Sequence, residues 1–354
     1  MIIGTGQTLQ RAATLADARS PVELMAESVR SAAADAKLAD VPAIDSIRIV
    51  QFYSWRYDDP AYSLGEALGQ QPAERAVSSA GGNSPQSLVN LTSLEIQAGK
   101  LDLAVLAGGE TWRTRGRARK ENYDFDWAKS SGGTEPPRMI GAELKMSHPL
   151  ETERGITMPV QVYPMFETAL RAAAGEGVDE HQVKISELWS RFSNVAAGNA
   201  YAWLQRALSA EEIRTPGPNN RMIGFPYPKY MNSNNDVDMT AAIIMCSVER
   251  ARSLGVPEDR WVFPHTGADS HEHYFVSERI TFTDTPAIRI GGQRTLELAG
   301  VGIDDIEVVD LYSCFPSAVQ LGAQSLGLSL DRQLTRTGGL SFAGGPWNNY
   351  VMHA

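Results

Sequence analysis

The chain has 354 residues, of which 43% are hydrophobic, so it is long enough to bury a large core. We expect two units of similar size or one large domain. The formal charge of -10 argues against nucleic acid or an anionic membrane as the main partner, because either would require a basic face.

The two cysteines and the apolar runs narrow the class further. Cys246 and Cys314 lie far apart and outside any CxxC spacing, which argues against a disulfide framework or a structural zinc site. No apolar run approaches the roughly 20 residues that a membrane helix needs, and the first residues, MIIGTGQ, lack the features of a signal peptide. We therefore expect a cytoplasmic protein that handles a small molecule.

A helix and a buried strand are the first predicted elements after the opening strand IIGTGQ. Ser20, followed by Pro21 and Glu23, is the pattern of an N-cap, a first-turn proline and a capping box, so an amphipathic helix begins there. The segment IDSIRIVQFYSW, residues 44–55, is apolar and rich in β-branched and aromatic residues, which predicts a buried strand.

The same pattern recurs late in the chain. A helix beginning at Thr285-Pro286 is followed by IDDIEVVDLYSCF, which aligns with IDSIRIVQFYSW without a gap at a spacing of 259 residues. Three further matches keep the order at spacings of 258 and 257 residues: Leu68-Gly69 with Leu326-Gly327, Arg75 with Arg332, and Gly81-Gly82 with Gly338-Gly339. An ordered series of this kind predicts an internal duplication.

Each half alternates strands and helices, which favours an α/β fold with a mostly parallel sheet between helices. Ligands of such sheets bind at the carboxyl ends of the strands. Residues 112–231 match nothing in the second half and are expected to form an inserted loop domain with a helical stretch over residues 178–213. The predicted domains are an N-terminal half (1–111), the insertion (112–231), a closing strand and helix (232–257) and a C-terminal half (258–354).

Three segments resemble motifs of the thiolase superfamily. GGNSPQSLVNLTSLEIQAGKLDLAVLAGGE, residues 81–110, is similar to the segment that runs from the nucleophilic cysteine of thiolases through a helix to a strand ending in Gly-Gly and glutamate. VDLYSCF resembles the segment that reads N-E-A-F or H-D-C-F, and GGLSFAGGP resembles the G-H-P segment. The resemblance covers nearly the whole chain and implies a homologue of sterol-carrier-protein-type acetyl-CoA acetyltransferases. It also implies the thiolase fold, in which duplicated βαβ-rich halves form a layered αβαβα sandwich with an inserted loop domain.

The catalytic side chains of that family are absent at the aligned positions. Gly82 stands in the position of the nucleophilic cysteine, Gly345 in that of the histidine, and Tyr312 in that of an asparagine or histidine. Claisen condensation needs a thiolate, a base and positioned donors, whereas glycine supplies only a backbone N–H. A serine at position 79 or 84 does not replace the thiolate, because it needs an adjacent base.

The start of the helix after the first glycine pair is the candidate ligand contact. Gly81, Gly82 and Asn83 open this predicted helix, and free N–H groups there attract a carbonyl or an anion, although a plain tight turn is the alternative. Ser84 precedes Pro85 and is predicted to be the N-cap, with a hydroxyl contact to bound ligand as the alternative.

Tyr312, Ser313 and Cys314 are the candidate catalytic side chains. A phenol can act as an acid or a base, and thiolase-like aldolases of steroid side-chain breakdown, which resemble this fold and work with an OB-fold partner, are thought to use tyrosines. Tyr312 and Tyr350 are candidates for that role, with a buried tyrosine packed at a strand end as the alternative. Cys314 is more typical of a small buried hydrophobic residue.

Two basic segments are candidates for contact with coenzyme A. The run Arg113, Arg115, Arg117, Arg119 and Lys120 matches either a phosphate-binding face or a solvated surface. Arg221, Lys229 and Asn232 lie in NNRMIGFPYPKYMN, which resembles the loop before the active-site strand of sterol-carrier-type thiolases, so we expect them on the pantetheine and adenine side of the ligand. His271 and His273 lack the i, i+4 spacing of a helical metal site, so no metal is expected.

Together these features predict a thiolase-like protein that binds acyl-CoA as ligand or substrate, holds no permanent cofactor and has little or no thiolase activity. The alternatives are a retro-aldol lyase acting on a β-hydroxyacyl-CoA with Tyr312 as base, or a non-catalytic structural subunit. The strand after Arg75 is the candidate edge for a homodimer, and an OB-fold domain is the other expected partner. By the repeat, about thirty residues matching the first-half helix and strand after Ser84 are expected beyond Ala354, where thiolases carry their second cysteine.

Overall fold

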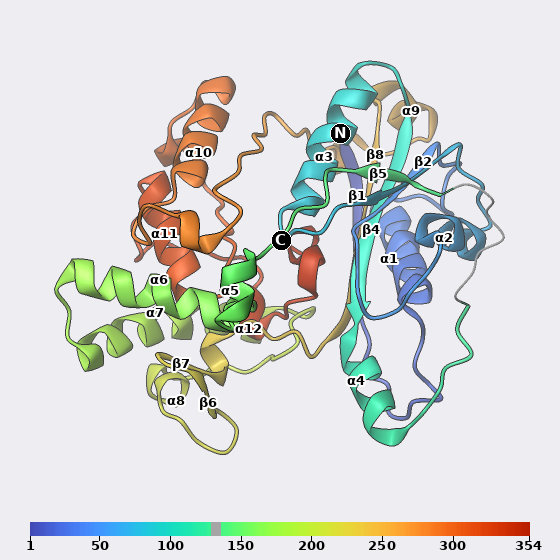
Figure 1. Cartoon of the computed structure of the whole chain (residues 1–354). Helices are drawn as coiled ribbons and strands as arrows, with labels where there is room; N and C mark the ends of the chain where they lie inside the picture. The colour runs from blue at the N-terminus through green and yellow to red at the C-terminus, as the bar shows by residue number, and fades with distance from the viewer. Residues whose placement is uncertain (129–135) are drawn as a thin grey trace. The chain divides into compact units, whose positions relative to one another are not determined.

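The structure is a computed structural model that describes residues 1–128 and 136–354 (Figure 1). The chain forms two compact units. Unit 1 comprises Met1–Glu143, Asn235–His265 and Pro346–His353, and unit 2 comprises Leu144–Asn234, Thr266–Gly345 and Ala354. Among the described residues, every helix is too short or too polar to span a membrane.

Unit 1 is built on a six-stranded mixed sheet. The spatial order is β1 (Ile2–Leu9), β8 (Asp238–Cys246), β4 (Leu103–Thr111), β2 (Ser46–Ile49), β3 (Glu74–Ser78) and β5 (Arg138–Ile140). β2 runs parallel to β4 and β3, β3 runs parallel to β5, and β8 runs antiparallel to β1 and β4. The carboxyl ends of β4, β2 and β3 therefore share one edge of the sheet, which we call the carboxyl edge.

Helices cover both faces of this sheet because side chains alternate along its strands. On one face, Leu103, Val105 and Ala107 of β4 share a core with α1 (Pro21–Asp35), α2 (Pro60–Leu68) and α9 (Val248–Ser253). On the other face, Ala104 and Leu106 pack with α3 (Ser84–Gln97) and with η5 (Trp347–Met352). A sheet flanked by helices confirms the α/β fold class.

The predicted start of α1 is confirmed in its hydrogen bonds. Ser20 Oγ accepts from the Glu23 N–H at 3.3 Å, and Glu23 Oε2 accepts from the Ser20 N–H at 2.7 Å. These two bonds satisfy backbone donors that the first turn of the helix leaves open, so a short sequence pattern is enough to set the helix start.

Unit 2 is mostly helical. Its longest helices are α6 (Pro159–Ala174), α7 (Val178–Gly198), α10 (Pro286–Ala299) and α11 (Pro316–Leu326). The apolar periodicity predicted over residues 178–213 is confirmed in α7, whose Leu188, Phe192 and Ala196 are buried. The shorter elements are α5 (Pro149–Glu153), α8 (Ala210–Arg214), the hairpin β6 (Met222–Gly224) and β7 (Tyr227–Pro228), η1 (Lys229–Met231), η3 (Val276–Glu278), η4 (Ile303–Asp305) and α12 (Gly339–Phe342).

The prediction of a strand within IDDIEVVDLYSCF, residues 303–315, is wrong. Ile303–Asp305 form the 3₁₀ turn η4, and residues 306–313 join no sheet in the part of the chain that the structure describes. In unit 1 the repeat-related strand β2 pairs along its length with β3 and β4. A strand needs such neighbours to satisfy its backbone, and the described residues of unit 2 supply no equivalent of β4. The preceding helix, α10, does begin at Pro286 as predicted.

The expectation that the strand after Arg75 is a sheet edge is also wrong. That strand, β3, pairs on its outer side with β5, which places Ala76 opposite Arg138 and Ser78 opposite Ile140. The covering strand comes from residues that match nothing in the second half, so the repeat contained no signal for it. A homodimer through β3 would have to displace β5.

Arg48 is a charged side chain buried within the unit 1 sheet. Its side chain is fully buried on β2, where Nε donates to Ser46 Oγ at 3.0 Å and Nη1 donates to Thr92 Oγ1 at 2.9 Å. It also forms ion pairs with Glu95 and, at 3.2 Å, with Glu74.

We predict that Arg48→Ala lowers the free energy of unfolding by about 3–5 kcal/mol, because it leaves the carboxylate of Glu95 buried without its main partner. Arg138 is the matched control, since it reaches the same Glu95 and Glu74 from a side chain that is 45% exposed. Arg138→Ala should cost less than about 1 kcal/mol. Urea denaturation compares the two, and equal losses would contradict this account.

Candidate functional site

The start of α3 lies at the carboxyl edge of unit 1, where Asn348 ties it to a neighbouring loop. The Gly81 N–H donates to Asn348 Oδ1 at 3.1 Å, and Asn348 Nδ2 donates to the Gln51 carbonyl at 2.9 Å. The Gly81 N–H, which the sequence predicts to be free for a ligand, is thus already bonded to the side-chain carbonyl of Asn348. Gly82 is half-buried and Asn83 is exposed at the same helix start.

The prediction that Ser84 is the N-cap of α3 is wrong by one residue. Ser84 is the first residue of the helix, and Asn83 is the N-cap without a side-chain capping bond. The Ser84 hydroxyl instead donates to the Ser79 carbonyl at 2.9 Å, so it fastens the loop between β3 and α3. Because that loop folds back on the helix start, the hydroxyl has a nearer acceptor than a capping position would offer.

Asn349 packs against Gly108, close to the carboxyl end of β4. A Cβ on Gly108 would collide with Asn349 Oδ1 and with Val50, so this approach requires glycine. Both amide atoms of Asn349, together with Gln51 Oε1 and Thr111 Oγ1, are buried and have no hydrogen-bond partner among the described residues. Buried polar atoms normally have partners, so this edge offers hydrogen bonds to water or to a bound group.

Glu110 holds the loop that follows β2. Its side chain is fully buried, Oε1 accepts from the Tyr53 N–H at 2.9 Å, and Oε2 accepts from the Ser54 N–H at 2.8 Å. Burial raises the pKa of Glu110 to about 7, although these hydrogen bonds and the charge of Arg115 oppose the shift. The carboxyl group therefore changes protonation state near neutral pH. Glu110 is the last residue of the Gly-Gly-Glu motif at the end of β4, and the motif alone indicates no role for it.

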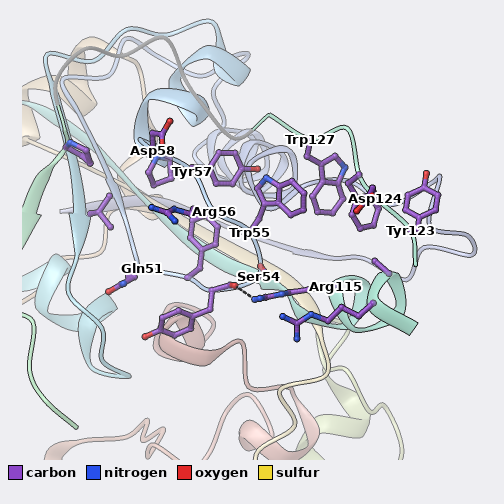
Figure 2. Close-up of a pocket in the computed structure, with 18 of the residues that line it drawn as sticks. Gln51, Ser54, Trp55, Arg56, Tyr57, Asp58, Arg115, Tyr123, Asp124 and Trp127 are labelled. Atoms are coloured by element: carbon purple, nitrogen blue, oxygen red, sulfur yellow. Dashed lines mark hydrogen bonds between the residues drawn. The ribbon is translucent and has the colours of Figure 1, made fainter. Parts of the chain in front are cut away.

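A cavity of about 1400 Å³ opens beside this loop (Figure 2). Its walls come from the loop after β2, from α4 (Trp112–Glu121) and from residues 122–127 and 136–139. Aromatic rings dominate one wall: Phe125 and Trp127 stack at 3.9 Å, and Trp55 meets Trp127 edge-on at 5.0 Å. We call this the aromatic cavity. No sequence motif indicates this cavity, because its walls come from separate segments.

The arginine run on α4 divides between structural contacts and the aromatic cavity. Arg113 pairs with Asp236 at 3.0 Å, and Arg117 donates to the Ala12 carbonyl at 2.7 Å. Arg115 and Arg119, four residues apart on the helix, line the cavity, and Arg115 also donates to the Tyr53 carbonyl. Burial and the neighbouring Arg119 lower the pKa of Arg115.

In unit 2, Tyr312, Ser313 and Cys314 lie before α11 beside Tyr163 of α6. Burial raises the pKa of Cys314 to about 12, so its thiol stays protonated at neutral pH and is a poor nucleophile. Burial around the hydroxyl, followed by the influence of Cys314, raises the pKa of Tyr312, which favours hydrogen-bond donation over action as a base. Ser313 Oγ accepts from the Leu340 N–H at 3.4 Å.

The remaining unit 2 candidates are a glycine and a hairpin. The Gly345 N–H donates to the Asn234 carbonyl at 2.8 Å, and a Cβ on Gly345 would collide with Ser233 Oγ. Asn232 is buried and donates to the Pro228 carbonyl at 2.8 Å, so its side chain holds the hairpin. Arg221 and Lys229 are exposed.

The predicted site residues are thus divided between the two units. Gly81, Gly82, Asn83 and Ser84 belong to unit 1, as does the fully buried Tyr350. The others belong to unit 2: Arg221, Lys229, Asn232, Tyr312, Ser313, Cys314 and Gly345. A shared cavity that joins Gly82, Tyr312 and Gly345 stays a prediction.

We predict that Glu110 makes the free energy of unfolding depend on pH. Its pKa in the folded state, about 7, lies above the ordinary 4.5, so the folded state favours the protonated carboxyl. The resulting stabilisation is full below about pH 4.5 and is lost as the pH rises through 7, by about 3 kcal/mol in total. Glu110→Gln cannot titrate and should lack this slope. Urea denaturation between pH 5 and 8 measures it, and parallel profiles for the two proteins would refute the assignment.

Comparison with known proteins places the chain in a family. No family model and no curated protein matches it. A solved structure, the monomeric SCP2-thiolase like protein type 1 from Mycobacterium smegmatis, is 32% identical and has a TM-score of 0.82, over 99% of this chain and 69% of that one.

Two more distant structures share the fold. An Ltp2-ChsH2(DUF35) aldolase has a TM-score of 0.67 at 18% identity, covering 97% of this chain and 85% of that one. An acetyl-CoA acetyltransferase from Syntrophomonas wolfei has a TM-score of 0.63 at 14% identity, covering 99% and 90%. The identity to the Mycobacterium smegmatis protein over 99% of this chain shows that the chain belongs to the thiolase superfamily, among its SCP2-thiolase-like proteins.

Proposed function

We propose that this thiolase-like protein binds acyl-CoA thioesters and does not catalyse the thiolase reaction. The observation that carries the proposal is the pair of glycines at the aligned catalytic positions. Gly82 offers no thiolate at the start of α3, and Gly345 offers no imidazole; a Cβ at position 345 would collide with Ser233 Oγ as that side chain stands. Covalent acyl transfer needs both groups, so binding is the function that remains.

Three features support binding of a CoA thioester. The carboxyl edge of unit 1 presents buried polar atoms of Asn349 and Gln51 that lack partners among the described residues. Cationic side chains, Arg115 and Arg119, line a large cavity in the same unit. The Syntrophomonas wolfei protein, whose name refers to acetyl-CoA, shares the fold over most of its length. Cationic groups and unpaired donors suit a ligand with phosphates and carbonyls.

The second candidate is a retro-aldol lyase, favoured by the protonated cluster of Tyr312, Cys314 and Tyr163 in unit 2. In that reaction the Cα–Cβ bond of a β-hydroxyacyl-CoA breaks, the hydroxyl proton leaves, and the α-carbon takes up a proton. The raised pKa keeps Tyr312 protonated, so its hydroxyl is present as a donor for the last step. The structurally similar aldolase is named together with a DUF35 protein, so a partner domain belongs to this alternative. A structural subunit without ligand is the third candidate.

We predict that the wild-type protein shows no thiolysis of acetoacetyl-CoA, no aldehyde release from β-hydroxyacyl-CoA, and a melting temperature that rises by a few degrees in saturating CoA. Gly82→Cys alone should not create thiolysis, because residue 345, which aligns with the catalytic histidine of thiolases, is still glycine. Thiolysis is measured by the CoA-dependent loss of acetoacetyl-CoA absorbance, aldehyde release by chemical trapping, and CoA binding by thermal melting.

Each outcome separates the candidates. Thiolysis by the wild-type protein would refute the proposal. Aldehyde release that is lost in Tyr312→Phe, but kept in the control Tyr274→Phe, would favour the lyase; Tyr274 is 54% exposed in the same unit. A melting temperature unchanged by CoA, with no aldehyde released, would refute the acyl-CoA binding proposal.

A further inference from the structure

The aromatic cavity is large enough for a whole small-molecule ligand. Its volume of about 1400 Å³ exceeds the range of about 300–1,000 Å³ that is usual for small-molecule sites. Residues predicted from the sequence to contact a thioester, Gly81 to Ser84, are not among those that line it. The cavity is therefore distinct from the predicted thioester contact at the start of α3.

The aromatic wall is suited to a flat ring. Trp127 is stacked on Phe125, and Trp55 is fixed beside them by a hydrogen bond from its Nε1 to the Ala128 carbonyl at 3.1 Å. Figure 2 shows Trp55 and Trp127 side by side in this wall. Rings held in this way lose little freedom when a planar ligand stacks on them, and such stacking is tolerant of the identity of the ring.

The same cavity carries cationic side chains suited to phosphate. Arg115 and Arg119 line it from one face of α4, and Arg56 lines it from the loop after β2. Among residues that the structure describes, neither Arg56 nor Arg119 has a carboxylate within ion-pair distance. Guanidinium groups bind phosphate through paired hydrogen bonds. The acidic residues of the lining, Asp58 and Asp124, are acceptors for an exocyclic amino group.

We propose that the aromatic cavity binds a purine nucleotide, with the base against the aromatic wall of Trp55 and Trp127 and the phosphates held by Arg115 and Arg119. The flat base matches the aromatic rings of the lining, its amino group matches the carboxylates, and the phosphates match the arginines. A free nucleotide and the nucleotide end of coenzyme A share this chemistry. In the second case the inference rests on the proposed function, since the ligand is then the same acyl-CoA.

Calorimetric titration with adenosine 3′,5′-bisphosphate, coenzyme A and pantetheine tests the site on the full chain. We expect the bisphosphate to bind the wild-type protein. Arg119→Glu should raise its dissociation constant at least about tenfold, through loss of a charge-assisted contact and added repulsion. Trp127→Leu should raise it by about fivefold to a hundredfold, the usual effect of a lost stacking contact. Lys120→Glu is the matched control, because Lys120 is exposed on the same helix and does not line the cavity; its effect should stay below about threefold.

The three ligands separate the possible results. Binding of coenzyme A and the bisphosphate, both weakened by Arg119→Glu, places the nucleotide end of coenzyme A in the cavity. Binding of the bisphosphate without coenzyme A supports the nucleotide site and overturns the proposed function. Binding of coenzyme A and pantetheine without the bisphosphate, unaffected by Arg119→Glu, overturns this inference alone. Equal losses in Arg119→Glu and Lys120→Glu, or no binding of the bisphosphate, also overturn it.

Discussion

The side-chain amide of Asn348 fixes the geometry at the carboxyl edge of unit 1. It accepts from the Gly81 N–H and donates to the Gln51 carbonyl, so one residue joins the start of α3 to the loop after β2. The segment around it, Pro346–His353, belongs to unit 1 although the residues before it belong to unit 2. Met352 anchors this segment in the core beside Leu88, and His353 Nδ1 lies 2.9 Å from Gln7 Oε1. Burial lowers the pKa of His353 to about 3, so the ring stays neutral there.

This anchoring explains why small and polar residues gather at the carboxyl edge. Gly108 cannot carry a side chain because Asn349 lies against it. Two residues further along β4, Glu110 accepts hydrogen bonds from the N–H groups of Tyr53 and Ser54. That loop borders the aromatic cavity. One edge of a single sheet thus presents both the helix start at which thiolases place their nucleophile and a cavity with aromatic and cationic walls. This arrangement is the basis of our proposal that the protein binds a ligand without acyl transfer.

Sequence alone predicted the features that depend on neighbouring residues. The capping box of α1, a strand within residues 44–55 and the buried face of α7 follow from local patterns, and each is confirmed, the strand over the shorter span of β2. The family resemblance identified the helix start at Gly82, but not the donor lost to Asn348, because that bond joins residues 267 positions apart. Three other features likewise depend on contacts between distant parts of the chain, which no short motif encodes. They are the pairing of β5 with β3, the absence of a strand over residues 306–313 and the aromatic cavity. The predicted N-cap of α3 is wrong by one residue, because the Ser84 hydroxyl donates to the Ser79 carbonyl in the preceding loop.

The central claim is that Asn348 holds the start of α3 by taking the Gly81 N–H. Hydrogen exchange of the Gly81 amide, followed by NMR in wild type and in Asn348→Ala, measures this bond directly. We predict at least about tenfold faster exchange at Gly81 in the variant, with amides in α1 unchanged and no effect of the control Asn194→Ala, an exposed position on α7. Equal exchange at Gly81 in the wild-type protein and Asn348→Ala would contradict the account.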